Sequence, residues 1–322
     1  MRYRPLGRTA NQVSEIGYGA WGIGGKQWLG GSDSESVAAL RRAFDLGVNF
    51  IDTALAYGGG HSEKLVGETV RSAPGRIYIA TKVPPKNGLW PARPGIGISK
   101  VFPYDYVIEC TEESLRNLKL ETIDLQQLHV WNSEWTAGDE WRRAFEDLKK
   151  SGKAQAVGVS VNAGQPDSAL DLVRTGLVDS IQVVYNIFDQ TPEANLFPLV
   201  RESNVGLLAR VPLDEGALTG TITENTVFEK GDFRDWYFRG DRKREVVQHV
   251  AALRRDLAGV KGSLPEIALR FCLSSPEVST VIPGMRRVRN VEANCSVSDL
   301  GPLGADVLAI LHQHAWVKDF HS

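Results

Sequence analysis

Four side chains capable of acid–base chemistry follow three consecutive apolar segments of the sequence. Asp52, Lys82 and His129 each stand at the end of one segment, and Tyr57 comes five residues after Asp52. If the segments are neighbouring parallel strands, their carboxyl ends meet on one face, which is where barrel enzymes place their active sites. A carboxylate, a phenol, an ammonium and an imidazole would then share one site.

This combination favours proton transfer by the phenol of Tyr57. A tyrosine has an ordinary pKa of ~10. An ammonium at ~4 Å favours the phenolate by roughly 4 kcal/mol at an effective dielectric constant of ~20, before desolvation is subtracted. Asp52 would keep a buried Lys82 charged, and His129 would orient a substrate oxygen. Each residue also has an ordinary role open to it (turn cap, solvated strand end, packed histidine, rim aromatic), but four together on one face favour a site without a metal.

The elements that position these residues alternate along the whole chain. Eight short segments are apolar and β-branched without a break, which is typical of parallel strands buried on both faces; they span residues 13–18, 48–52, 77–82, 123–129, 156–161, 180–185, 206–211 and 280–283. Segments between them show helical spacing, as in 36–46, 107–118, 141–150 and 168–175. No linker interrupts the chain, so the pattern predicts a single (β/α)8 TIM barrel domain over residues 1–322.

The stretch after the seventh predicted strand differs from the rest. Residues 212–239 lack clear periodicity, and loops of this length in compact domains are usually functional. We therefore predict a long loop over the active site, in which residues 228–242 could form a lid. An extra C-terminal helix is expected to hold His312 and His314, whose i, i+2 spacing does not suit a metal.

The glycines near the N-terminus raise a different possibility. Gly17, Gly19 and Gly22 match the dinucleotide fingerprint G-x-G-x-x-G, which requires a helix directly after it. The tract that follows, up to Gly31, is too rich in glycine for a helix, and the first acid at a strand end, Asp52, comes about ten residues too late. We expect a glycine-lined strand end instead of a Rossmann site.

Composition excludes several classes of protein. The net charge of −2 argues against nucleic-acid and acidic-membrane partners. No segment is apolar enough for a membrane span, and the first residues do not resemble a signal peptide. Three well-separated cysteines, Cys110, Cys272 and Cys295, are expected to be buried thiols in a reducing compartment. We predict a cytoplasmic protein.

Three motifs together resemble the aldo-keto reductase family. They are FIDTALAYGGGHSEKLVG at residues 50–67, followed by ATKV and DLQQLHVWN. The resemblance implies a barrel that binds NADPH without a Rossmann motif. It also implies that Tyr57 is the general acid, that Lys82 and Asp52 tune it, and that His129 orients the carbonyl. A hydride from nicotinamide C4 would reduce an aldehyde or ketone, or the reverse reaction would oxidise an alcohol.

The resemblance also implies the cofactor contacts. Ser160, Asn162 and Gln182 would hold the carboxamide, although many members have adjacent Ser and Asn where Val161 intervenes here. Arg210 takes the place of an aromatic that stacks on the nicotinamide. The remaining candidates border the nicotinamide at the mouth of strand one (Gly19 and Trp21, beside Asp52), follow the pyrophosphate (Leu213, Gly216 and Leu218) or hold the adenosine end (Gly284, Arg286, Asn290 and Asn294).

The resemblance also implies a cofactor preference and a class of substrate. Arg286 is the best 2′-phosphate ligand, because many members have Lys where this chain has Gly284. Arg287 and Arg289 either assist it or form a solvated helix face. We predict NADPH over NADH, a small-molecule carbonyl substrate and a monomer. Trp21, Trp90 and Trp131 either wall the substrate pocket or pack under the loops.

Two other functions are compatible with parts of this pattern. One is a cofactor-binding regulatory module of the same fold with little turnover, like the reductase-fold channel subunits. The other is a cofactor-free lyase that forms a Schiff base at Lys82. The complete set of four acid–base residues counts against the first, and the arginines after strand eight count against the second.

Overall fold

Eight parallel strands form the centre of the computed structural model, which describes residues 1–318 and 320. Each strand pairs with the next along the chain, and the strands are β3 (Tyr18–Gly19), β4 (Phe50–Asp52), β5 (Tyr78–Val83), β6 (Ile123–Leu128), β7 (Ala154–Ser160), β8 (Ser180–Val184), β9 (Gly206–Arg210) and β10 (Val278–Val281). Parallel bridges join Ile16 to Val281 and Gly19 to Gly284. These bridges close the sheet into the predicted barrel.

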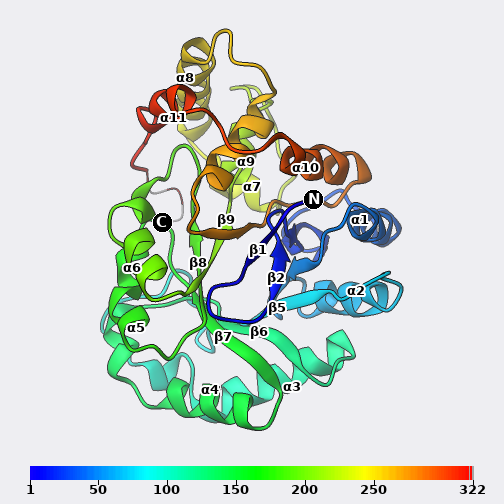
Figure 1. The fold of residues 1–322 in the computed structure, drawn as a ribbon, viewed down its shortest axis with the longest axis vertical. Coiled ribbons are helices and arrows are strands. Elements are labelled where there is room, and N and C mark those ends of the chain that lie inside the picture. The colour runs from blue at the N-terminus through cyan, green and yellow to red at the C-terminus, as the bar shows by residue number, and fades with distance from the viewer. Residues whose placement is uncertain (319, 321–322) are drawn as a thin grey trace.

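Helices surround the strands on the outside (Figure 1). The helices of the described residues are α1 (Asp33–Asp45), α2 (His61–Val70), α3 (Tyr104–Leu118), α4 (Glu140–Lys150), α5 (Leu170–Arg174), α6 (Leu196–Glu202), α7 (Phe233–Tyr237), α8 (Arg242–Asp256), α9 (Leu264–Ser274), α10 (Val288–Leu300) and α11 (Ala305–His312). The predicted periodic segments fall in α1, α3, α4 and α5, and α11 is the extra C-terminal helix. No helix in the described part of the chain is long and apolar enough to cross a membrane.

The first predicted strand is wrong in one respect. Residues 13–18 are not one strand, because β2 (Gln12–Ser14) pairs antiparallel with β1 (Tyr3–Pro5), and only β3 joins the barrel. The hairpin places the buried side chains of Leu6 and Val13 in one cluster with Phe50 and Leu125. The apolar run in the sequence therefore serves two elements, a hairpin that covers the barrel interior and a barrel strand.

Close packing inside the barrel requires glycine at particular places. A Cβ on Gly19 would lie 2.6 Å from the carbonyl oxygen of Ile282, and one on Gly158 would lie 2.3 Å from Ser180 Oγ. Real Cβ atoms do not come this close to other atoms, so these glycines permit strand contact where a side chain would prevent it. Gly19 thus permits the close contact with residues 282–284 at the seam where the barrel closes.

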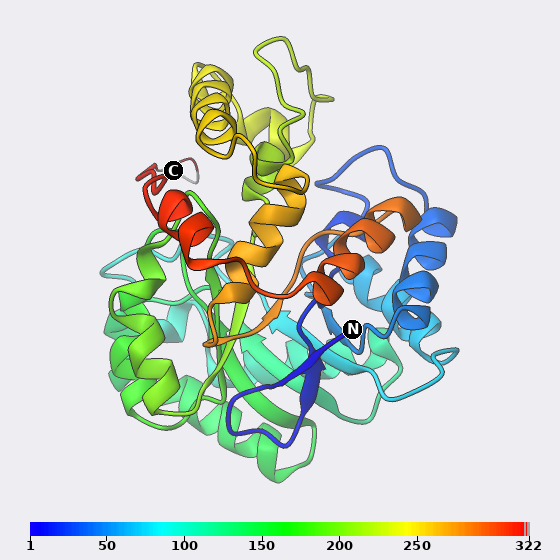
Figure 2. The same ribbon diagram turned by 45° about the horizontal axis from the view of Figure 1, so that its top comes forward.

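The segment after β9, residues 211–241, contains more structure than predicted. It includes the 3-10 turn Asp214–Thr219 and the short helix α7 before α8 begins. Its Phe233 N–H donates to the Gln27 carbonyl at 2.7 Å, and the Leu29 N–H donates to Asp232 at 3.0 Å. The post-β9 segment (211–241) is thereby tied to the β3–α1 loop (20–32), and Figure 2 shows it with α8 standing out from the ring of helices.

Candidate active site

Lys82 is the centre of the acid–base group. It is fully buried on β5, and its Nζ donates to Asp52 Oδ1 at 2.6 Å, to the Thr53 carbonyl at 2.7 Å and to Tyr57 Oη at 3.3 Å. Burial opposes the charge, but Asp52 and Tyr57 raise the pKa of Lys82 above its ordinary value. An ammonium with three acceptors is not a free amine, which argues against a Schiff base at this lysine.

Two glutamine amides hold the other oxygen of Asp52. Gln182 Nε2 donates to Asp52 Oδ2 at 2.8 Å, and Gln127 Nε2 donates at 3.4 Å. Gln182 also donates to Gln127 Oε1 at 3.4 Å. The sequence analysis did not identify Gln127. A glutamine inside an apolar strand, as at Gln127 and Gln182, is a signal that the barrel interior holds a polar group. The prediction from the sequence also placed Gln182 against the cofactor alone, whereas its amide group here contacts Asp52.

Tyr57 is a protonated phenol at neutral pH. Burial raises its pKa, and Lys82 acts in the opposite direction without outweighing burial. The ring of Trp21 stacks on it with centroids 6.1 Å apart. A buried phenol that lies against an ammonium can donate its proton and leave a stabilised phenolate, which is the chemistry of a general acid.

His129 packs edge-on against Tyr57, with ring centroids 5.6 Å apart. Burial, Lys82 and Arg210 hold the pKa of His129 well below its usual value, so the imidazole is neutral. Its Nδ1 is buried and has no hydrogen-bond partner in residues 1–318 and 320. Trp90 packs edge-on at 4.4 Å. A neutral imidazole here can donate one hydrogen bond to a substrate oxygen.

These groups open into a cavity of about 1190 Å³ at the mouth of the barrel. Most predicted site residues share its wall: Gly19, Trp21, Asp52, Tyr57, His129, Ser160, Asn162, Gln182, Arg210, Leu213, Gly216, Gly284, Arg286 and Asn290. Three do not: Lys82 lies behind Asp52 and Tyr57, and Leu218 and Asn294 are buried outside the wall. The structure thus brings residues from distant parts of the chain to one place.

The predicted carboxamide ligands differ in what they contact. Asn162 accepts from the Ala92 N–H at 3.1 Å and donates to the Ala92 carbonyl at 3.1 Å and to Gln165 at 2.9 Å. Its side chain therefore fastens the loop after β5. Ser160 lies opposite Gln182 in the β7–β8 register. Asn162 is thus engaged by loop residues, whereas Ser160 and Gln182 lie side by side on the cavity wall.

Arginines dominate the charge of the cavity wall. Arg210, Arg234, Arg286, Arg287 and Arg289 line it, against two acids, Asp52 and Glu215. Arg287 and Arg289 therefore face the cavity, which sequence reasoning left open. Helix α10 begins directly after Arg287, and its first turn contains no acidic residue. This donor set suits an anion of several charges.

Unpartnered donors support that conclusion. The Nε atoms of Arg210 and Arg287 and the Nε1 of Trp28 are buried without a hydrogen-bond partner in the part of the chain that the structure describes. Arg286 uses its Nη1 on the carbonyls of Trp28 and Leu29, at 3.2 and 2.6 Å. Buried donors ordinarily have partners. A phosphorylated dinucleotide would supply acceptors, so the residues fit such a cofactor.

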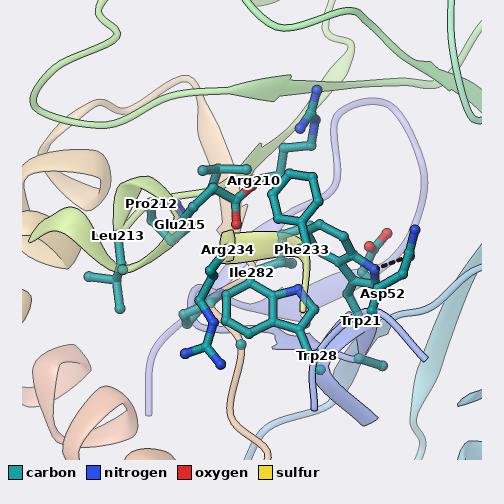
Figure 3. A pocket seen from close by; sticks show the side chains of 18 of the residues that line it. Trp21, Trp28, Asp52, Arg210, Pro212, Leu213, Glu215, Phe233, Arg234 and Ile282 are labelled. Atoms are coloured by element: carbon teal, nitrogen blue, oxygen red, sulfur yellow. Dashed lines mark hydrogen bonds between the residues drawn. The ribbon is translucent and has the colours of Figure 1, made fainter. Parts of the chain in front are cut away.

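Glu215 is the acid that sequence reasoning missed. It follows Arg210 on the post-β9 segment, and Figure 3 shows both labelled on the wall of the same pocket. Burial raises the pKa of Glu215 to about 8, with Arg210 acting to lower it. Arg210 itself donates from Nη2 to the Val161 carbonyl at 3.0 Å. An acid beside glycine in a loop carries no periodic signal, so the sequence could not place it.

The predicted substrate tryptophans divide into two groups. Trp21 and Trp90 line the cavity, whereas Trp131 is fully buried and packs edge-on against Trp135 and Trp141. Packing under the loops is thus the correct alternative for Trp131. No group of three or more potential metal ligands occurs among the described residues.

A comparison with known families gives the same result as this geometry. The sequence model of the Aldo/keto reductase family matches residues 15–315. The chain belongs to the aldo/keto reductase family. It is therefore an oxidoreductase of the class that uses a nicotinamide cofactor on carbonyl groups.

Individual relatives of this aldo/keto reductase match along nearly their whole length. Aldo-keto reductase YhdN of Bacillus subtilis is 30% identical over 303 residues, covering 91% of this chain and 87% of the relative. NADH-specific methylglyoxal reductase of Escherichia coli is 28% identical, with 95% and 96% covered. The solved structure of aldo-keto reductase AKR11C1 from Bacillus halodurans, in its holo form, is similar with a TM-score of 0.78 at 26% identity and 100% of both chains covered.

Proposed function

We propose that this aldo/keto reductase reduces an aldehyde or ketone with NADPH, with Tyr57 as the proton donor. The observation that carries the proposal is Lys82, whose Nζ joins Asp52 and Tyr57 at the base of a cavity rich in arginine. The reaction is reversible, so the same residues oxidise the corresponding alcohol.

Each of the four residues has one task in this proposal. When bound, NADPH supplies a hydride at nicotinamide C4. Tyr57 Oη gives its proton to the substrate oxygen as that oxygen gains charge, and Lys82 stabilises the phenolate that remains. Asp52 keeps Lys82 charged and oriented. His129, neutral and beside Tyr57, donates a hydrogen bond that orients the carbonyl.

The cofactor would lie along the arginine-lined wall. Gly19, Trp21, Ser160, Gln182 and Arg210 would border the nicotinamide, and Asn162 would support them through the loop after β5. Leu213 and Gly216 would follow the pyrophosphate, with Leu218 and Asn294 supporting from behind the wall. Gly284, Arg286 and Asn290 would hold the adenosine end. NADPH over NADH remains a prediction, because one relative is named NADH-specific.

Three further predictions concern the whole protein. We propose that residues 1–322 act as one domain, that the enzyme is a monomer and that it is cytoplasmic. The substrate is a small-molecule carbonyl compound whose identity the assay below would reveal.

The direct test is NADPH consumption by the purified chain with a panel of aldehydes and ketones, followed by its near-ultraviolet absorbance. We expect turnover with at least one carbonyl compound and faster turnover with NADPH than with NADH. Tight NADPH binding without turnover on any of them would contradict an enzymatic role and favour a regulatory module.

A further inference from the structure

Glu215 is an acidic residue on the arginine-rich wall of the cavity. It lies between Leu213 and Gly216 on the post-β9 segment, and only 7% of it is exposed. Five arginines share the cavity wall, and Asp52, the other acid on it, is bound to Lys82. Glu215 has no such role in the acid–base group, so its presence beside the proposed path of the cofactor needs an explanation.

The neighbouring acid shows that the position of Glu215 is specific. Asp214 binds Lys318 of the C-terminal segment (residues 313–318, after α11). It also accepts from Tyr237 Oη at 3.4 Å, and it is not part of the wall. Both residues have left-handed backbone, with φ of 50° at Asp214 and 54° at Glu215. Asp214 thus contacts Lys318, whereas Glu215 lies on the wall of the cavity (Figure 3).

The charged groups around Glu215 come from several elements. Arg210 on β9, Lys318 in the C-terminal segment and Arg234 on α7 favour its carboxylate, while Asp214 on its own segment disfavours it. Burial exceeds their combined effect and raises the pKa of Glu215 to about 8. The side chain is therefore mostly a neutral acid at pH 7.

The protonation state decides what Glu215 can bind. A carboxylate only accepts hydrogen bonds, and so do the oxygens of a diphosphate, whereas a carboxylic acid donates one. We propose that Glu215 binds the diphosphate of the nicotinamide cofactor as a carboxylic acid, so that cofactor binding takes up a proton in mildly alkaline solution. This inference rests on the proposed function, since it requires a nicotinamide dinucleotide in the cavity.

The proposal links the affinity for NADPH to the protonation of Glu215. If the cofactor requires protonated Glu215, the Kd for NADPH rises with pH above the pKa of that residue, by up to about tenfold per pH unit. The 2′-phosphate titrates near pH ~6, so measurements from about pH 7 to 9 separate the two groups. Arginines keep their charge over this range.

The experiment measures the Kd of the full chain for NADPH across this pH range by quenching of tryptophan fluorescence. Calorimetry in two buffers of different ionisation enthalpy counts the protons taken up on binding. We expect wild-type affinity to fall with pH and a fraction of a proton to be taken up. Glu215→Gln, a neutral donor, should bind with little pH dependence and several-fold more tightly than wild type at the alkaline end. Glu224→Gln, an exposed acid of the same segment, should behave like wild type.

Two results would overturn the proposal. A wild-type Kd that stays constant over the range would show that no proton is linked, and a parallel fall for Glu215→Gln would assign the linkage to another group. Both results leave the reductase function intact. A chain that bound neither NADPH nor NADP+ at any pH would instead overturn the proposed function, and this inference with it.

Discussion

At the scale of single residues, the acidity of Tyr57 depends on Lys82, which contacts it, and also on groups that do not contact it. Asp52 acts to raise the pKa of Tyr57 through its negative charge, whereas Lys82 acts to lower it. The amides of Gln127 and Gln182 donate to Asp52 and so reduce the charge that Tyr57 experiences. Gln127 is therefore a positioning residue, which acts on Tyr57 through Asp52 and Lys82.

We expect Gln127→Leu to raise the apparent pKa of Tyr57, because Asp52 would lose a donor. Alcohol oxidation requires the phenolate, so the rise of its kcat with pH should move upward by a few tenths to about one pH unit. A pH profile of kcat measures this shift. A lower kcat with an unmoved profile would show that Gln127 only supports packing.

A second prediction concerns the 2′-phosphate. Arg286→Ala should raise the KM for NADPH much more than the KM for NADH, because only NADPH carries the phosphate that the guanidinium would bind. Steady-state kinetics with both cofactors provides the measurement. Arg286 also binds the carbonyls of Trp28 and Leu29, so an equal effect on both cofactors would assign it to holding the loop instead.

At the scale of elements, the post-β9 segment has an unusual backbone. Val211, Asp214 and Glu215 all have positive φ without being glycine. Such residues cost about 1–3 kcal/mol each and persist where their surroundings fix them. Lys318 supplies one of these contacts through Asp214, with its ammonium 4.5 Å from the Trp316 ring centroid. The C-terminal segment therefore supports the wall of the cavity.

Removing that contact should loosen the segment. We expect Lys318→Ala to lower the free energy of unfolding by roughly 1.5–3 kcal/mol, since it breaks a hydrogen bond to a buried charge. NADPH affinity should also fall several-fold. Thermal unfolding and hydrogen exchange of residues 211–219 would measure both effects, with the exposed Lys261→Ala as a control. Unchanged exchange and affinity would show that the segment holds its shape without the C-terminal segment.

The same elements show where sequence reasoning reaches its limit. Uninterrupted apolar segments identified seven barrel strands, because burial on both faces leaves a pattern in the sequence. Periodicity could not separate the hairpin strand Gln12–Ser14 from Tyr18–Gly19, since they are only three and two residues long. It also missed α7, a five-residue helix that begins where Asp232 accepts from the Arg234 N–H at 2.9 Å.

At the scale of the whole molecule, the barrel explains which site residues were predictable. Asp52, Lys82 and His129 end strands or follow them directly, so any parallel closed sheet brings them together. Gln127 and Glu215 depend on contacts that the sequence does not encode locally: Gln127 meets Asp52 across 75 residues, and Glu215 faces the cavity through a left-handed turn. The fold therefore predicts the acid–base group better than the residues that tune it.

We propose above all that Tyr57 donates the proton while the rest of the site holds the cofactor. The most direct measurement is carbonyl reduction by Tyr57→Phe, with NADPH binding to the same preparation measured by fluorescence. We expect turnover to fall by about 2–4 orders of magnitude or more, while the Kd for NADPH stays close to that of the wild type. Near-normal turnover in this variant would contradict this role, because the proton would then come from a group other than Tyr57.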